Sequence, residues 1–132
     1  MITKRILVVD DEQSITRLLK LNLEKTGFYT VREENLGARA VEAAREFQPH
    51  LILLDVMMPD LDGGDVAAAL QGEPLLKDIP IVFLTAAVKP EEIKARDGVI
   101  GGFPYVAKPL NLKGVMKAIE KHLGDQTGLT PA

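Results

Sequence analysis

The chain has 132 residues, of which 46% are hydrophobic and none is cysteine, a composition that fits one globular domain folding without disulfides. A formal net charge of −3 argues against a nucleic-acid surface built on a general positive field, and no apolar stretch approaches the roughly 18 residues of a membrane span. We therefore expect a cytoplasmic protein that binds neither nucleic acid nor membrane.

The first half of the chain alternates short apolar runs with stretches of helical periodicity. In chain order, these predict a strand over 6–9, a helix over 14–26, a strand over 29–32, a helix over 36–47 and a strand over 51–54. The strand over 29–32 is polar enough to suit a sheet edge, whereas the strand over 51–54 is wholly apolar and suits the sheet interior. Gly27 and Pro49 are the expected stops of the two helices.

The second half continues the alternation less regularly. It predicts a helix over 65–71, a strand over 81–84, a helix over 90–97, a strand over 105–107 and a helix over 112–123. Pro90 suits a first helical turn, the glycine-rich residues 98–102 end that helix, and Pro104 is tolerable only at a strand start or on an edge. Residues 1–124 are expected to form the domain, and the polar residues 125–132 a free terminus or linker stub.

Five strand and helix repeats predict an α/β fold, a doubly wound parallel sheet with helices on both faces. In such sheets, ligands bind at the carboxyl ends of the strands. Polar residues follow four of the predicted strands: Asp10 and Asp11 the first, Asp55 the third, Thr85 the fourth and Lys108 the fifth. We expect these side chains to meet in one site.

Three carboxylates cannot lie close together in ionised form without a cation, because like charges raise one another's pKa. Mg²⁺ suits such a cluster, since it prefers oxygen ligands and is usually held by one or two carboxylates together with phosphate oxygens. Asp55 is then the natural nucleophile for phosphoryl transfer. Lys108 and Thr85 would bind the remaining phosphoryl oxygens.

Four segments carry a resemblance to a known family: VVDDE at 8–12, LLDVMMPDLDG at 53–63, FLTA at 83–86 and YVAKPL at 105–110. In this order they resemble the receiver domain of response regulators in two-component signal transduction, over about residues 4–123 and most closely the stand-alone, chemotaxis-regulator type. The resemblance implies a flavodoxin-like sheet of five parallel strands in the order 2-1-3-4-5. It also implies a sensor histidine kinase or histidine phosphotransfer protein as phosphoryl donor, a downstream protein partner, and a monomer or phosphorylation-dependent dimer. The domain would be a signalling switch and not an enzyme, although it assists its own phosphoryl transfer and slow dephosphorylation.

The resemblance also implies roles for single residues. Asp11 and Asp55 would ligate Mg²⁺ directly, with Mn²⁺ as an alternative, the backbone carbonyl of Met57 would be a third ligand, and Asp10 would act mainly through water.

On the family pattern, Tyr105 would be the switch aromatic, whose rotation follows the movement of Thr85 towards the phosphoryl group, and the peptide bond between Lys108 and Pro109 would be cis.

The sequence departs from the family pattern at two places. Residues 101–104 read Gly-Gly-Phe-Pro where many members carry small and acidic residues, and Met57 and Ala87 lack the polar side chains that could orient a hydrolytic water.

Plainer interpretations remain open at this stage. Asp10 and Asp11 could simply cap the first helix, Lys108 could be a solvated turn residue, and Tyr105 could be a static half-buried aromatic. A phosphatase resembling haloacid dehalogenases is disfavoured, because its nucleophile follows the first strand in an Asp-x-Asp pattern that this chain lacks. A flavin-binding protein would need a phosphate loop after the first strand, which Gln13 and Ser14 do not supply. A receiver-shaped interaction module that is never phosphorylated is the third alternative.

Overall fold

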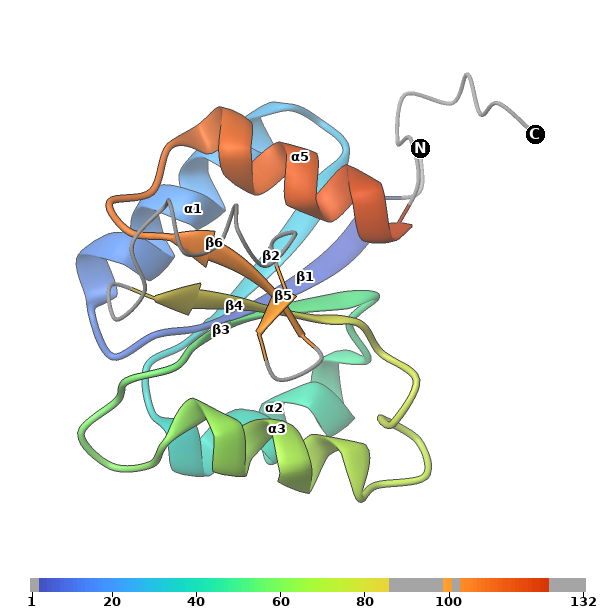
Figure 1. Cartoon of the computed structure of the whole chain (residues 1–132). Coiled ribbons are helices and arrows are strands. Elements are labelled where there is room, and N and C mark those ends of the chain that lie inside the picture. The colour runs from blue at the N-terminus through green and yellow to red at the C-terminus, as the bar shows by residue number, and fades with distance from the viewer. Residues whose placement is uncertain (1–2, 86–98, 101–102, 124–132) are drawn as a thin grey trace.

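A computed structural model of the chain describes residues 3–85, 99–100 and 103–123 (Figure 1). The predicted helix over 90–97, Ala87, Gly101 and Gly102, and the tail over 125–132 lie outside the described residues. No helix in the described part is long and apolar enough to cross a membrane.

The strands form one sheet in the order β2-β1-β3-β4-β6-β5. The strands are β1 (Lys4–Val9), β2 (Tyr29–Glu34), β3 (Leu51–Asp55), β4 (Ile81–Thr85), β5 (Val99–Ile100) and β6 (Phe103–Ala107). All neighbours pair in parallel except β5, which pairs antiparallel with β6. The five parallel strands, counted along the chain, therefore have the predicted order 2-1-3-4-5, and β5 adds a short sixth strand that the sequence did not indicate.

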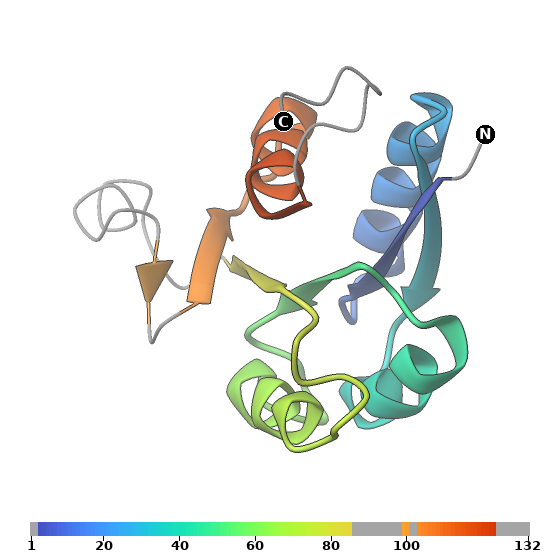
Figure 2. The same cartoon turned by 90° about the vertical axis from the view of Figure 1, so that its right-hand side faces the viewer.

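Helices cover both faces of the sheet, as predicted. The described helices are α1 (Gln13–Lys25), the 3₁₀ turn η1 (Gly37–Arg39), α2 (Ala40–Phe47), α3 (Gly63–Gln71) and α5 (Leu112–Leu123). α1 and α5 lie on one face, and α2 and α3 on the other (Figures 1 and 2).

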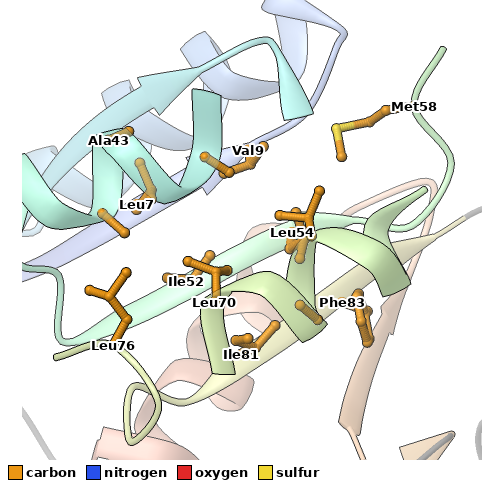
Figure 3. Close-up of a cluster of buried hydrophobic side chains, with 14 residues drawn as sticks. Leu7, Val9, Ala43, Ile52, Leu54, Met58, Leu70, Leu76, Ile81 and Phe83 are labelled. Atoms are coloured by element: carbon orange, nitrogen blue, oxygen red, sulfur yellow. The ribbon is translucent and has the colours of Figure 1, made fainter. Parts of the chain in front are cut away.

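β3 and β4 are buried at every position, and β1 is buried from Ile6 onwards, so these stretches are apolar up to the polar residues at the strand ends. Along β1, Leu7 and Val9 pack towards α2 and α3, whereas Ile6 and Val8 pack towards α1 and α5, which is the two-residue period of a strand. Figure 3 shows the first of these two clusters, in which Ile52 and Leu54 of β3 lie beside Leu7 and Val9 of the neighbouring strand β1 and pack with residues of α2 and α3. Two cores of this kind leave β3 no freedom to slip, which fixes the position of Asp55 at its end.

The prediction that the second strand lies at a sheet edge is confirmed, and α1 covers part of that edge. Lys20 Nζ donates to the Val31 carbonyl at 2.8 Å, and Glu24 Oε2 accepts from the Val31 N–H at 2.9 Å. The pair thereby satisfies backbone groups that an open edge would offer to another strand.

The predicted start of the second helix is wrong. The helix expected over 36–47 begins instead as the 3₁₀ turn η1 and becomes α-helical only at Ala40. The Arg39 N–H bonds to the Leu36 carbonyl at 3.1 Å, and the amides of Gly37 and Ala38 bond to the carboxylate of Asp60. This tighter turn depends on a residue far along the chain, so helical periodicity could not reveal it.

Candidate functional site

The register of the sheet brings the predicted site residues together at the carboxyl ends of the parallel strands, which form one edge of the sheet. The aligned pairs nearest this edge are Val9 with Leu54, Asp55 with Leu84, and Thr85 with Ala107. Asp10 and Lys108 each follow the last residue of a strand, so they lie beside Asp55 and Thr85. The convergence expected from the strand ends is therefore present in the structure.

Three carboxylates meet at this edge. Asp10, Asp11 and Asp55 each offer an oxygen, and these oxygens all lie within 4.8 Å of one another. Asp10 and Asp55 are buried, with 0% and 4% of their surface exposed, whereas Asp11 is exposed. An all-oxygen set that is closed on one side and open on the other fits a hard divalent cation such as Mg²⁺, which keeps several of its waters.

Lys108 is the cation that the structure places among these carboxylates. Its Nζ lies 2.9 Å from Asp10 Oδ2, 3.5 Å from Asp55 Oδ1 and 3.9 Å from Glu12 Oε1, and its side chain is only 12% exposed. Burial lowers the pKa of Lys108, but the hydrogen bond to Asp10 and the surrounding negative charges raise it above its ordinary value overall. Lys108 is therefore fully charged at neutral pH and is shared among several carboxylates.

The charge balance around Asp55 is nevertheless incomplete. Burial and the nearby charge of Asp10 raise the pKa of Asp55 from its ordinary value to about 7, although Lys108 and the N–H of Met57 act in the opposite direction. One lysine thus does not compensate for the cluster, and an additional cation would favour the ionised form of Asp55.

The loop after β1 holds Asp10 by its backbone. The Glu12 N–H donates to Asp10 Oδ1 at 2.9 Å, so this carboxylate does accept from the turn before α1, while Glu12, at the N-cap position, makes no side-chain capping bond. Asp10 therefore stabilises the turn before α1 and does not cap the helix itself. The other oxygen faces Lys108.

The loop after β3 closes tightly behind Asp55. The Gly63 N–H donates to the Val56 carbonyl at 2.7 Å, and Asp62 caps α3 by accepting from the Gly64 N–H at 2.7 Å. This cap explains why α3 begins two residues before the predicted boundary. A Cβ atom at Gly63 would lie 2.4 Å from the Asp55 carbonyl oxygen and 2.7 Å from Val56 Cα.

Met57 lies at the mouth of the site. Its N–H donates to Asp55 Oδ1 at 3.3 Å, and its side chain is 67% exposed. The Met57 thioether is at most a weak hydrogen-bond acceptor, so it cannot bind a water molecule strongly beside Asp55.

Thr85 and Tyr105 lie on the side of the site next to β6. Thr85 is fully buried, and its carbonyl accepts from the Lys108 N–H at 2.9 Å. Tyr105 is half-buried, and its ring centroid lies 5.3 Å from that of Phe83, one strand away. The peptide bond between Lys108 and Pro109 is cis.

Two further residues contact the site that sequence reasoning did not single out. Glu12 reaches towards Lys108, and Asn35 donates from its side-chain amide to the Asp10 carbonyl at 2.8 Å. Glu12 belongs to the VVDDE motif and could have been proposed as a site residue from the sequence. Asn35 lies in a polar stretch without a motif, so the sequence does not mark it as a site residue.

Comparisons with known proteins agree with this geometry. A family model described as "Response regulator receiver domain" matches residues 6–120. The polar-differentiation response regulator DivK of Brucella anthropi is 33% identical over 123 residues, which covers 92% of this chain and 98% of the relative. DivK of Brucella ovis is likewise 33% identical over 124 residues, with 93% and 98% covered.

Solved structures are similar over nearly the whole fold. The chemotaxis protein CheY4 of Vibrio cholerae has a TM-score of 0.79 at 29% identity, with 92% of this chain and all of that chain covered (100%). A putative response regulator from Chloroflexus aurantiacus has a TM-score of 0.78 at 27% identity, with 94% and 100% covered.

The close approach at Gly63 generates a prediction about stability. Gly63→Ala should lower the free energy of unfolding by about 1–3 kcal/mol, because the added methyl group would displace the backbone of Asp55 or Val56. Urea unfolding measures this change.

Gly72→Ala is the matched control. Its methyl group would meet only helix carbonyl oxygens at 3.5 Å, and Gly72 already has helical backbone angles, so this change should be neutral or stabilise by about 0.4–1 kcal/mol. Equal stability of Gly63→Ala and the wild type would contradict the tight closure of the loop.

Proposed function

Because the chain belongs to the response regulator receiver family, we propose that it is a phosphorylation switch in which Asp55 accepts a phosphoryl group. Receiver domains are in general signalling domains of two-component systems and not enzymes. The observation that carries the assignment of the acceptor is the convergence of Asp10, Asp11 and Lys108 on Asp55 at the carboxyl edge of the sheet.

Asp11 and Asp55 would hold Mg²⁺ directly, the Met57 carbonyl would supply a third protein ligand, and Asp10 would act through a bound water. When bound, the ion supplies positive charge that screens the approach of an anionic donor. The three clustered carboxylates support this assignment, because they present oxygen ligands next to an acceptor whose pKa is raised.

Phosphoryl transfer to Asp55 is then an in-line displacement at phosphorus. One carboxylate oxygen of Asp55 forms the new P–O bond while the P–N bond to a donor imidazole breaks. The leaving imidazole keeps the bonding electrons and takes up a proton from solvent. A sensor histidine kinase or a histidine phosphotransfer protein would be this donor, and a small phosphodonor such as acetyl phosphate would lose acetate in the same way.

Lys108 and Thr85 would bind the phosphoryl oxygens of the product. Lys108 Nζ is already 3.5 Å from Asp55 Oδ1, so a small movement away from Asp10 brings it to a phosphoryl oxygen. The Thr85 hydroxyl, on the neighbouring strand, would donate to a second oxygen. Met57 offers no polar side chain that could position a water molecule for attack, which favours slow loss of the phosphoryl group.

The change would be relayed to a protein partner through Tyr105. Movement of Thr85 towards the phosphoryl group changes the packing at the end of β4, and Tyr105 lies one strand away against Phe83. Rotation of Tyr105 would alter the surface formed by β6 and α5. A protein that binds one form of this surface more tightly would read the signal.

The proposed function first predicts that the purified domain gains one phosphoryl group from acetyl phosphate or phosphoramidate only when Mg²⁺ or Mn²⁺ is present. The reason is that the carboxylate cluster would otherwise repel the anionic donor. Intact mass spectrometry measures the incorporation.

The Asp55→Asn variant should not be labelled. Asp62→Asn is the matched control, because Asp62 is a carboxylate of the same loop that only caps α3, and it should be labelled like the wild type. Equal labelling of the wild type and Asp55→Asn would contradict the assignment of Asp55 as the phosphoryl acceptor.

A second prediction concerns the surface formed by β6 and α5. With Mg²⁺ and beryllofluoride, which mimics the phosphoryl group, hydrogen exchange should change around Tyr105 in β6 and in α5, and hardly at all in α2. Thr85→Ala should weaken this response, because the hydroxyl that couples the anion to the end of β4 is gone.

Thr30→Ala on the distant edge strand β2 serves as the control and should respond like the wild type. Exchange changes confined to the loops that carry Asp10, Asp55 and Lys108, with Tyr105 unaffected, would show that this surface does not transmit the signal.

A further inference from the structure

Residues 35–38, which follow β2 and include the first two residues of η1, lie between the two loops that carry the site carboxylates. We call residues 35–38 the bridging loop. At its first residue, the side-chain amide of Asn35 donates to the Asp10 carbonyl at 2.8 Å and to Thr16 Oγ1 at 3.0 Å. Both amide hydrogens of Asn35 are therefore used to hold the chain segment that presents Asp10.

At its other end, the bridging loop is bound to the loop that follows Asp55. The two carboxylate oxygens of Asp60 accept from the backbone N–H groups of Gly37 at 3.2 Å and Ala38 at 2.9 Å. The N–H of Ala38, followed by that of Gly37, lowers the pKa of Asp60 below its ordinary value, so this carboxyl is ionised at neutral pH and its hydrogen bonds are charge-assisted.

The start of the bridging loop is itself held rigidly. Glu34 Oε2 accepts from the N–H groups of Asn35 at 3.0 Å and Leu36 at 3.2 Å, and the Glu34 carbonyl accepts from the Asp10 N–H at 3.1 Å. A displacement of Asp10 would therefore be transmitted to residues 35 and 36 through several bonds.

Gly37 allows the bridging loop to approach the loop after β3 closely. A Cβ atom at this position would lie 3.1 Å from Met58 Cε and 3.3 Å from both Asp60 Oδ1 and Leu61 Cβ. Among the described residues, no backbone hydrogen bond joins residues 10–12 directly to residues 56–62. The bridging loop bonds to both segments, in addition to the ion pairs that Lys108 makes with Asp10 and Asp55.

We propose that the bridging loop fixes the spacing between the carboxylates of the β1 loop and the loop of Asp55, and that Asn35 and Asp60 are positioning residues for cation binding. This inference rests on the proposed function, since it concerns how the chain holds Asp10, Asp11 and Asp55 for a divalent ion. Neither residue is assigned as a ligand or as a phosphoryl contact.

The test is a double-mutant cycle on Mg²⁺ affinity, read from the chemical shifts of the backbone amides in the unphosphorylated protein. Asn35→Ala and Asp60→Ala each release one end of the bridging loop and should each raise the Mg²⁺ dissociation constant by about tenfold, the lower end of the range for lost hydrogen bonds around a metal site. The double variant should be about as weak as the weaker single variant, because releasing either end already frees the loop.

Two control variants separate positioning from charge and from general stability. Asp60→Asn removes the charge and keeps one of the two hydrogen bonds, because its amide oxygen can accept from one backbone N–H while its NH₂ group faces the other, so it should lose less affinity than Asp60→Ala. Arg5→Ala removes hydrogen bonds to the carbonyls of Phe47 and Gln48 at the opposite end of the sheet, and it should lower stability without changing Mg²⁺ affinity. All variants are compared well below their unfolding temperatures.

The possible results are distinct. Wild-type affinity in Asn35→Ala and Asp60→Ala overturns the role of the bridging loop and leaves the proposed function intact. Independent effects, which multiply to about a hundredfold in the double variant, also overturn it, as does equal loss in Asp60→Asn or Arg5→Ala. If the wild type binds no Mg²⁺ at millimolar concentrations, the proposed cation site fails, and the positioning role fails with it.

Discussion

The constraint on which the rest of the structure depends is the burial of Asp10 and Asp55 side by side, with Lys108 as the lysine between them in the part of the chain that the structure describes. Lys108 Nζ is 2.9 Å from one carboxylate and 3.5 Å from the other, yet the pKa of Asp55 is still raised to about 7. The site is therefore short of positive charge in this state. On the proposed function, a divalent ion would supply the missing charge and would free Lys108 to pair with an incoming anion.

The packing of the two apolar cores fixes the positions of Asp10 and Asp55. β3 is buried at every position, and its register with β1 and β4 leaves Asp55 no alternative location. Beyond the strand ends, the loops of the site are held by the Gly63 bond to the Val56 carbonyl and by the bridging loop between Asp10 and Asp60.

The fold could be predicted from the sequence because four of the strands contain an apolar run that is followed by the polar residues Asp10, Asp55, Thr85 and Lys108. That pattern placed Asp10, Asp55, Thr85 and Lys108 at one edge, where the structure has them. What the sequence could not reveal depends on contacts between distant residues. The 3₁₀ turn η1 exists because Asp60 binds its amides, and the bond of Asn35 to the Asp10 carbonyl comes from an unremarkable polar stretch. The antiparallel strand β5 has only two residues, too few for a periodic pattern.

The most direct test of the central claim is a ¹³C NMR titration of the Asp55 side-chain carboxyl carbon, with and without saturating Mg²⁺. If the buried carboxylates lack a cation, Asp55 in the metal-free protein titrates with a pKa of about 7, and Mg²⁺ lowers that pKa strongly because the ion stabilises the charged form. The folded metal-free protein then binds an extra proton relative to the unfolded chain between pH 3.8 and about 7, so its stability falls as the pH rises through this window. A titration of Asp55 near its ordinary pKa of 3.8, unchanged by Mg²⁺, would contradict the account.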